Sequence, residues 1–394
     1  MSDTKVYKIS VPAKASLFGL IVSIFMILSS ILIYKLTDTY NVLAILIPSL
    51  LSTINPLYAI TLQKGSASKR SILLTYIASI IILAISVGLG IFMLIDLKNN
   101  SFKPTIVNPQ IAVSYLLATI IIVYIGNIFV EKLCGDLHWR VGRLLSEDLI
   151  AIIYSSTVGI IGPTLAFFGV NKLDSYLAIF TILVSLIPLR GKVSSVYSIR
   201  RTEEFNKMLE TKVRDWISKL PVIKSLDTLK VQSIWLFAWV HIEVSVSQLI
   251  KDRENDLVNT LAVPIIDSIG TIVSMEIIIR YPKTHEIVIA VTVKDKEEVS
   301  EGLTDNFAII KVDNLKLEVI SRDSLTIEIT SEIPESTIIR SLAENHVDIL
   351  CTRKVYSTIK NLADGWFISI LEVKSTNVDG AIEEALSFIR SKLL

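Results

Sequence analysis

The chain has 394 residues, of which 51% are hydrophobic and only 20% are charged. Its mean hydropathy is +0.58, whereas soluble domains carry about 25% charged residues and need no such hydropathy. Lys and Arg (39) nearly balance Asp and Glu (38), and no basic stripe with interleaved aromatic residues occurs, so nucleic-acid binding is not expected. Two cysteines exclude a disulfide framework and a cluster held by four thiolates. The composition therefore indicates an integral membrane protein.

Six apolar stretches approach the length of about 20 residues that a helix needs to cross a bilayer. They cover residues 15–34, 42–62, 71–95, 110–130, 147–168 and 174–190, the last being short. Lys and Arg are concentrated before the first stretch and after the second, fourth and sixth stretches. Under the positive-inside rule both termini are expected in the cytoplasm. No small-residue cleavage pattern follows the first stretch, so we expect a multi-pass protein of the cell (plasma) membrane without a cleaved signal peptide.

Polar residues within these stretches are the candidates for function, because burying them in hydrocarbon is costly unless they pair or face a cavity. Pro48, Ser52 and Asn55 share one helical face of the second stretch, in which Pro48 and Pro56 free backbone carbonyls and predict a broken helix. Asp148 and Ser155 share a face of the fifth stretch. Asp148 is interpreted either as an acid near the start of a helix or as a cation ligand. Asn55 is interpreted either as an interhelical hydrogen-bonding residue or as a second cation ligand.

The rest of the chain predicts two cytoplasmic modules. A charged amphipathic helix at 200–220 precedes two strands, a helix at 257–269 and a strand ending near Pro282, which together predict a small α+β module. Residues 284–394 predict four strands, followed by alternating helices and strands and a last amphipathic helix, a pattern typical of a mixed sheet covered by helices. The predicted organisation is thus 1–199, 200–283 and 284–394. No phosphate-binding loop, nucleophile motif or metal-ligand histidine spacing occurs, so we do not expect an enzyme.

Residues 10–283 resemble the cation diffusion facilitator family. The likeness is carried by FGVNKLDSYLAIFTILVSL at 168–186, by WISKLPVIKSLDTLKVQ at 216–232, and by WVHIEVSVS at 239–247 followed by a helix and a strand. The resemblance implies six spans, a cytoplasmic α+β module that forms a homodimer, and efflux of a divalent cation (Zn, Mn, Fe or Co) in exchange for protons. It implies no permanently bound cofactor.

The family's metal site implies two ligands, four residues apart, in each of spans 2 and 5. Matched position by position, span 2 offers Leu51 and Asn55, and span 5 offers Asp148 and Ile152, so that two of the four ligands are lost. A shifted register includes Ser155 instead of Ile152. The resemblance therefore implies a degenerate transmembrane metal or proton site at Asp148, Asn55, Ser155 and Ser52. It also marks His241 as a weak candidate for a cytoplasmic metal ligand.

Residues 286–394 resemble the nitrogenase iron–molybdenum-cofactor biosynthesis proteins, which implies a ribonuclease-H-like fold. The likeness rests on IVIAVTVKDKEEVSEGLTDNFAIIKVD and on VDILCTRKVYSTIKNLADGWFISILEV. The family's His-Phe-Gly element is replaced here by Ser300, Glu301 and Gly302. The module is therefore expected to bind a ligand or partner rather than a metallocluster.

Two functions remain open on the sequence. The first is a divalent-cation efflux transporter that works by proton antiport, with lipid, divalent cations and protons as its partners. The second is a transport-inactive membrane-anchored sensor or scaffold, whose C-terminal module binds a ligand or partner.

Overall fold

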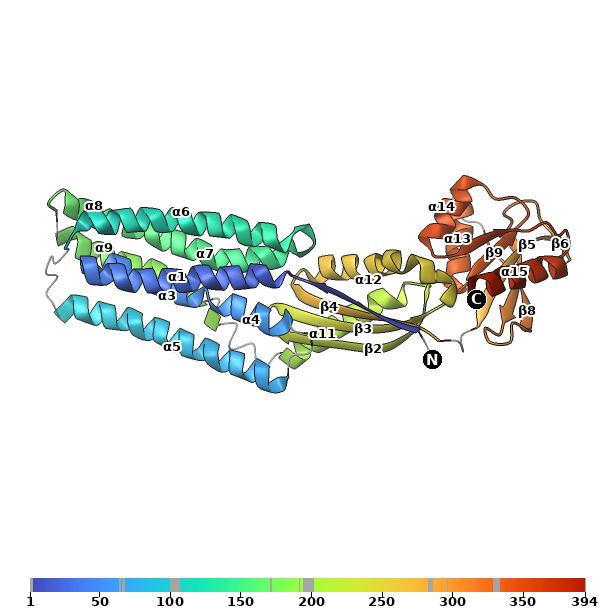
Figure 1. Cartoon of the computed structure of the whole chain (residues 1–394), viewed down its shortest axis with the longest axis horizontal. Helices are drawn as coiled ribbons and strands as arrows, with labels where there is room; N and C mark the ends of the chain where they lie inside the picture. The colour runs from blue at the N-terminus through green and yellow to red at the C-terminus, as the bar shows by residue number, and fades with distance from the viewer. Residues whose placement is uncertain are drawn as a thin grey trace.

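The chain folds into three parts that follow one another along a long axis: a helix bundle, a four-stranded sheet and a C-terminal mixed sheet (Figure 1). The computed structural model describes residues 3–63, 65, 68–99, 107–170, 172–190, 192–193, 202–282, 286–295, 297–328 and 334–393. We call the end of the bundle next to the four-stranded sheet the sheet end, and the opposite end the far end.

The bundle contains five helices, among the described residues, that are long and apolar enough to cross a membrane. Three are continuous: α1 (Ala13–Thr37), α5 (Lys69–Asn99) and α6 (Pro109–Cys134). Large apolar side chains on these helices are exposed, which suits a lipid environment. The chain is therefore compatible with a multi-pass membrane protein.

The other apolar stretches are interrupted or short. The second consists of α2 (Tyr40–Ala44), α3 (Leu46–Leu51) and α4 (Ile54–Gln63). The fifth consists of η1 (Asp136–His138), α7 (Trp139–Gly159) and α8 (Ile161–Phe167), so it begins eleven residues before the predicted start at 147. The sixth is α9 (Lys172–Ser185), which has only 14 residues. Because an α-helix rises about 1.5 Å per residue, α9 alone is too short to cross the hydrocarbon core.

Proline explains where the interrupted helices break. Proline has no N–H, and its ring collides with the carbonyl of the residue four positions earlier. For Pro48 that residue is Ala44, where α2 ends, and for Pro163 it is Gly159, where α7 ends. For Pro56 it is Ser52, which follows the last residue of α3. The broken helix predicted for the second stretch from its prolines is thus confirmed.

The middle part contains the predicted helix, hairpin, helix and strand. Helix α11 (Thr202–Ser218) precedes the hairpin of β2 (Ile223–Ile234) and β3 (Phe237–Val246), and after η3 (Gln248–Arg253) helix α12 (Glu254–Ile269) leads to β4 (Ile272–Tyr281). The apolar stripe of this predicted amphipathic helix, formed by Leu209, Val213 and Ile217 of α11, is buried against the sheet. The sheet has the order β1-β4-β3-β2, in which β3 and β4 are parallel and the other pairs antiparallel.

The edge strand β1 (Asp3–Ser10) was not expected from the sequence, which placed these residues with the membrane part. Its pairing with β4 puts the N-terminal segment on the same side of the bundle as the later modules. Glu254, the first residue of α12, accepts hydrogen bonds from the Lys5 ammonium at 2.7 Å and from the Tyr7 hydroxyl. Burial alone would raise the pKa of Glu254, but its interactions with Lys5, Tyr7 and Tyr281 outweigh burial and lower the pKa below its usual value.

Glu254→Gln is expected to lower the free energy of opening β1 from β4 by about 1–2 kcal/mol, because a neutral amide is a weaker hydrogen-bond acceptor than a carboxylate. The ion pair with the half-exposed Lys5 contributes little to this loss. The pKa of Glu254 is lowered by folding, so its stabilisation is present above the unfolded-state pKa and is lost as pH falls through the folded-state pKa. Hydrogen exchange of residues 3–10 measures both effects. Asp256→Asn, on the same helical turn but exposed, should leave the exchange unchanged, and equal exchange in both variants would contradict the assignment.

The sheet is docked directly into the sheet end of the bundle. Ile234, Phe237, Trp239 and Val273 belong to the same buried apolar cluster as the helices of the bundle. His138 Nδ1 lies 3.2 Å from the carbonyl oxygen of Ile272, and Arg140 donates to the carbonyl of Asp267 in α12. The bundle and the sheet therefore share one core at this end.

The C-terminal module is a mixed sheet with the strand order β10-β9-β5-β7-β8. The strands are β5 (Ile287–Asp295), β6 (Glu298–Val299), β7 (Asn306–Val312), β8 (Val319–Thr326), β9 (Ile349–Thr352) and β10 (Ser369–Glu372). Strands β5, β9 and β10 are parallel, whereas β7 and β8 continue the sheet antiparallel. Two of the four strands predicted for this module, at 317–323 and 325–330, form one strand, β8, because Ser324 between them stays extended and pairs with Ala308 of β7. Residues 329–330 lie outside the described residues.

Helices cover both faces of this sheet. Helices α13 (Pro334–Glu344) and α14 (Ser357–Gly365) pack on one face, and α15 (Val378–Leu393) packs on the other. Cys351 lies in the core of β9, and burial, with a smaller effect of Glu384, raises the pKa of its thiol to about 12. The thiol is therefore protonated and serves packing rather than nucleophilic chemistry.

Candidate functional site

The site is centred on a buried ion pair between Asp148 in α7 and Lys192. The Lys192 ammonium Nζ lies 2.6 Å from Asp148 Oδ2, and the two side chains are only 3% and 11% exposed. Asp148 lies nine residues beyond the start of α7, about 14 Å into the bundle at 1.5 Å per residue. An unpaired charge at this depth would be costly, so each group compensates the other.

The four-stranded sheet covers this ion pair from the sheet end. Trp235, in the turn between β2 and β3, has a φ of 55°, a conformation that non-glycine residues rarely adopt. This turn places the indole ring 5.3 Å from Lys192 Nζ, a cation–π distance. Lys192 therefore contacts a carboxylate of the bundle and an aromatic ring of the sheet.

Trp235→Ala is expected to cost about 0.5–2 kcal/mol of stability through the lost cation–π contact, beyond the loss of packing. Trp235→Phe should recover part of it, because a smaller aromatic face remains. Denaturant unfolding of the full chain in detergent measures both variants. The control Leu236→Ala removes an exposed apolar side chain from the same turn. If Trp235→Phe were as unstable as Trp235→Ala, the ring would contribute only packing.

Asn55, predicted as a second ligand, lies on α4 beside α7. Its Nδ2 donates to the carbonyl of Leu144 at 3.0 Å, one turn before Asp148. Its Oδ1 is buried and has no hydrogen-bond partner among the described groups. The structure therefore brings Asn55 to the α7 segment that carries Asp148 and leaves an amide oxygen uncommitted there.

Ser52 and Ser155, the other two predicted ligands, do not join Asp148 and Asn55 in a single site. Ser52 donates to Ser23 of α1 at 2.7 Å and also contacts the carbonyl of Ser49. Ser155 lies two turns beyond Asp148, fully buried, and its hydroxyl has no partner among the described groups. Leu51 and Ile152, the two positions without a ligating atom, are buried in the apolar core.

No group of three or more His, Cys, Asp or Glu side chains within the described part of the chain could hold a metal ion. Asp148 is the single carboxylate of the predicted set, and its charge is already matched by Lys192. The residues present therefore do not fit a tetrahedral zinc site, which takes four N, S or O ligands from the protein.

His241, the predicted cytoplasmic ligand, lies on β3. Its ring stacks on Trp239, with centroids 5.7 Å apart, and its Nδ1 lies 3.1 Å from Glu276 Oε2 on the neighbouring strand. The position thus joins two strands of the sheet through a cross-strand pair.

A second buried polar cluster, which sequence reasoning did not select as a site, lies at the far end. Asp174, at the start of α9 and 5% exposed, accepts from Asn41 Nδ2 at 2.6 Å and from the Thr39 hydroxyl at 3.4 Å. Thr181 in turn donates to Asn41 Oδ1 at 2.8 Å. Gly162 packs so closely that a Cβ there would lie 2.4 Å from Asp174 Oδ1.

Lys192 also escaped sequence reasoning as a site residue. In the sequence it is one of the basic residues after the sixth stretch. The shortness of the stretch at 174–190 is a signal that Lys192, two residues beyond it, lies near the bundle, but this signal does not identify Asp148 as its partner. For Asp174 the signal was an acid opening a helix, which by itself also fits a favourable interaction with the helix dipole.

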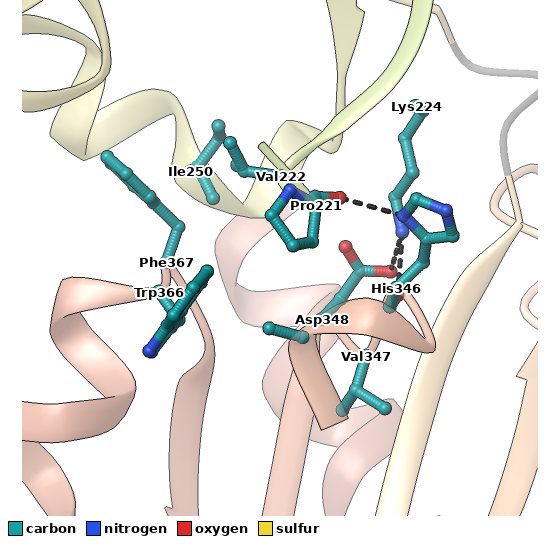
Figure 2. Close-up of a pocket in the computed structure, with 10 residues that line it drawn as sticks. Pro221, Val222, Lys224, Ile250, His346, Val347, Asp348, Trp366 and Phe367 are labelled. Carbon is teal, nitrogen blue, oxygen red and sulfur yellow. Dashed lines mark hydrogen bonds and ion pairs between the residues drawn. The ribbon is translucent and has the colours of Figure 1, made fainter. Parts of the chain in front are cut away.

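The sheet and the C-terminal module are joined by a second buried ion pair (Figure 2). Lys224 of β2 lies 3.1 Å from Asp348 Oδ2 and donates to the carbonyl of His346, while His346 Nδ1 lies 2.8 Å from the carbonyl oxygen of Pro221. Asp348 also accepts from the backbone N–H of Val288. The cavity among these residues is only about 10 Å³, room for at most one water. This region is a joint between modules rather than a ligand pocket.

A scan of the sequence against protein-family models gave no match, and a search of curated proteins gave none either.

Proposed function

We propose that the protein is a membrane transporter resembling the cation diffusion facilitators, which moves a cation across the membrane in exchange for protons at Asp148 and Lys192. The observation that carries the proposal is the desolvated Asp148–Lys192 ion pair within a bundle that has broken helices. Ionisable residues at membrane depth mark ion and proton pathways. Broken membrane helices are tolerated where they are enclosed by protein or line a cavity.

The exchange follows from the chemistry of the pair. The Asp148 carboxylate has one negative charge, and the Lys192 ammonium neutralises that charge from within the protein. When Lys192 gives up its proton, the carboxylate becomes available to a cation from solution. When Lys192 regains a proton, the ammonium competes with that cation and displaces it. Cation binding and proton binding are therefore mutually exclusive, which is the condition for antiport.

The atoms around Asp148 favour a cation that takes oxygen ligands. Besides the carboxylate, the neighbourhood offers the uncommitted amide oxygen of Asn55, and further along α7 the hydroxyl of Ser155. Such hard oxygen donors suit Mn²⁺ better than Zn²⁺, which is commonly held by imidazole or thiolate. Among the divalent cations implied by the resemblance, Mn²⁺ is therefore the first to test.

The order of elements supports the same proposal. Helix α11, the β2–β3 hairpin, α12 and β4 follow one another as the resemblance implies for the cytoplasmic homodimerisation module. With positively charged loops at the sheet end, the sheet and both termini would be cytoplasmic. The strand order β10-β9-β5-β7-β8, with antiparallel strands followed by parallel ones, supports a ribonuclease-H-like assignment for the C-terminal module.

The test is cation flux by the full-length protein in sealed proteoliposomes with an imposed pH gradient, for Mn²⁺, Zn²⁺, Fe²⁺ and Co²⁺. Flux should require the gradient and should be lost in Asp148→Asn. Glu147→Gln is the matched control, because Glu147 is the neighbouring acid but is half exposed and pairs with Arg143 on the surface. Flux that survives in Asp148→Asn would refute the site.

One observation favours the second candidate, a membrane-anchored sensor or scaffold. The buried joint of Lys224 and Asp348 ties the C-terminal module to the same sheet that holds Lys192 through Trp235. A ligand of the C-terminal module could thus act on the bundle without transport. Folded full-length protein that moves none of the four cations, yet is stabilised against heat by a small molecule, would favour this function.

A further inference from the structure

Helices α7 and α9 run antiparallel along one seam, which we call the α7–α9 seam. Asp148 lies on α7, and Lys192 lies seven residues beyond the end of α9. Two contacts fix its register: Asp148 with Lys192 at the sheet end, and Gly159 beside Thr181 towards the far end. Asp148 and Gly159 are 11 residues apart, and so are Thr181 and Lys192. The two intervals between these contacts therefore contain the same number of residues, and α9 forms the part of the second interval from Thr181 to Ser185.

This register places two serines level with each other in the middle of the seam. Ser155 comes seven residues after Asp148, and Ser185 comes seven residues before Lys192. Ser155 lies four residues before Gly159 in α7, and Ser185 lies four residues after Thr181 in α9. Four residues are about one helical turn, so both serines lie on the faces that meet where Gly159 packs beside Thr181. Ser156 is the next residue of α7.

The hydroxyls of these serines differ from those of the serines in α5, although Ser49 in α3 and Thr119 in α6 are also buried without a partner among the described groups. Ser155, Ser156 and Ser185 are fully buried, and none has a hydrogen-bond partner among the described protein groups. In α5, by contrast, Ser79 and Ser86 donate to the carbonyls four residues earlier in their own helix. That local bond is the usual way for serine to satisfy itself in a membrane helix. The hydroxyls of Ser155, Ser156 and Ser185 are therefore available for hydrogen bonds with another partner.

The seam ends at the far-end cluster around Asp174. Thr181 is one turn before Ser185 and bonds Asn41, which bonds the Asp174 carboxylate. Within the described side chains no Lys or Arg lies at ion-pair distance from Asp174. The carbonyl of Gly159 adds an acceptor, because residue 163 is proline and has no N–H to offer it. Glu147, the other acid near Asp148, faces the surface with Arg143.

We propose that the α7–α9 seam holds a chain of water molecules that carries protons between Asp174 at the far end and the Asp148–Lys192 pair at the sheet end. Buried polar atoms without protein partners are the places where internal water binds, with about three hydrogen bonds per water. Asp148 and Gly162 are 14 residues apart, so the path covers roughly 21 Å along the helices.

This inference rests on the proposed exchange and gives it a proton route. Asp174 takes a proton from the far side and becomes a neutral carboxylic acid. It passes that proton to the adjacent water, and successive transfers along the chain deliver a proton to the neutral Lys192 amine. The ammonium so formed pairs again with Asp148 and releases the cation. Each step moves one proton between an acid and a base, with no other bond made or broken.

Infrared difference spectroscopy of the full-length protein in lipid tests the seam without requiring transport. Between about pH 4 and 9, the wild type should show a protonated-carboxyl band that disappears in Asp174→Asn. It should also show O–H stretching bands of weakly bonded internal water. Those water bands should be lost in the double variant Ser155→Ala/Ser185→Ala and retained in the matched control Ser79→Ala/Ser86→Ala, whose hydroxyls are satisfied within α5.

A flux measurement then separates the seam from the exchange itself. With a pH-sensitive dye inside proteoliposomes, the seam variants and Asp174→Asn should slow the proton movement by about tenfold or more, whereas the α5 control should match the wild type. If exchange continues at the wild-type rate in the seam variants, the seam is refuted and the exchange stands. If no cation moves, the infrared bands still decide: water bands that are missing, or unaffected by the seam variants, overturn the proposal.

Discussion

Replacing Lys192 by methionine is expected to destabilise the protein by about 3–5 kcal/mol, the largest effect of any single substitution considered. Methionine keeps much of the side-chain volume but removes the charge that compensates Asp148. The carboxylate would then be buried without a partner in a region where both side chains are almost fully enclosed. Chemical unfolding of the full chain in detergent, followed by tryptophan fluorescence, measures the loss.

The double variant Asp148→Asn/Lys192→Met is the informative comparison. Removing both charges should recover most of the stability lost in Lys192→Met, because a buried ion pair adds little over neutral residues of similar size. The double variant should nevertheless remain inactive in transport. A double variant as unstable as Lys192→Met would show that Lys192 acts through its other contacts, such as the Trp235 ring.

Gly162→Ala is expected to cost about 1–3 kcal/mol, because overpacking a tightly packed interior forces its neighbours to move. The new Cβ would lie 2.4 Å from Asp174 Oδ1 and 2.6 Å from Asn41 Nδ2. These atoms are bonded to each other at 2.6 Å and buried, so neither can yield without breaking that hydrogen bond. Thermal unfolding of the reconstituted protein measures the effect.

Gly88→Ala in α5 serves as the control for Gly162→Ala. Nothing lies within 4 Å of a Cβ built at Gly88, and alanine is favoured over glycine inside helices by up to about 1 kcal/mol. Gly88→Ala should therefore be neutral or stabilising. If Gly162→Ala were equally harmless, the far-end cluster would be looser than the geometry indicates, and a precise role for Asp174 would lose support.

The sequence predicted the elements that depend on local pattern. The apolar stretches, the breaks near Pro48 and Pro56, and the α11 stripe of Leu209 and Val213 follow from hydropathy, proline chemistry and helical spacing. The selection of Asp148 as an ionisable residue at membrane depth also needed only its position within an apolar run. Such features are determined by residues that lie close together in the chain.

The features that escaped prediction depend on partners far apart in the chain. Strand β1 is defined by its pairing with β4, more than 260 residues later. Asp148 meets Lys192 across 44 residues, and Asn41 meets Asp174 across 133. Neither lysine nor asparagine carries a local signal for such a partner, since each also occurs in loops and helix ends. The sequence was therefore sufficient to select the acid of the candidate site, Asp148, but not its counter-ion, Lys192.

The most direct test of the central claim is the simultaneous measurement of cation and proton movement in the same proteoliposomes, with Mn²⁺ outside and dyes for Mn²⁺ and pH inside. The proposed exchange predicts that both signals change together in opposite directions in the wild type, and that both vanish in Asp148→Asn while Glu147→Gln behaves normally. Folded wild-type protein that shows neither signal, or an Asp148→Asn variant that retains both, would contradict it.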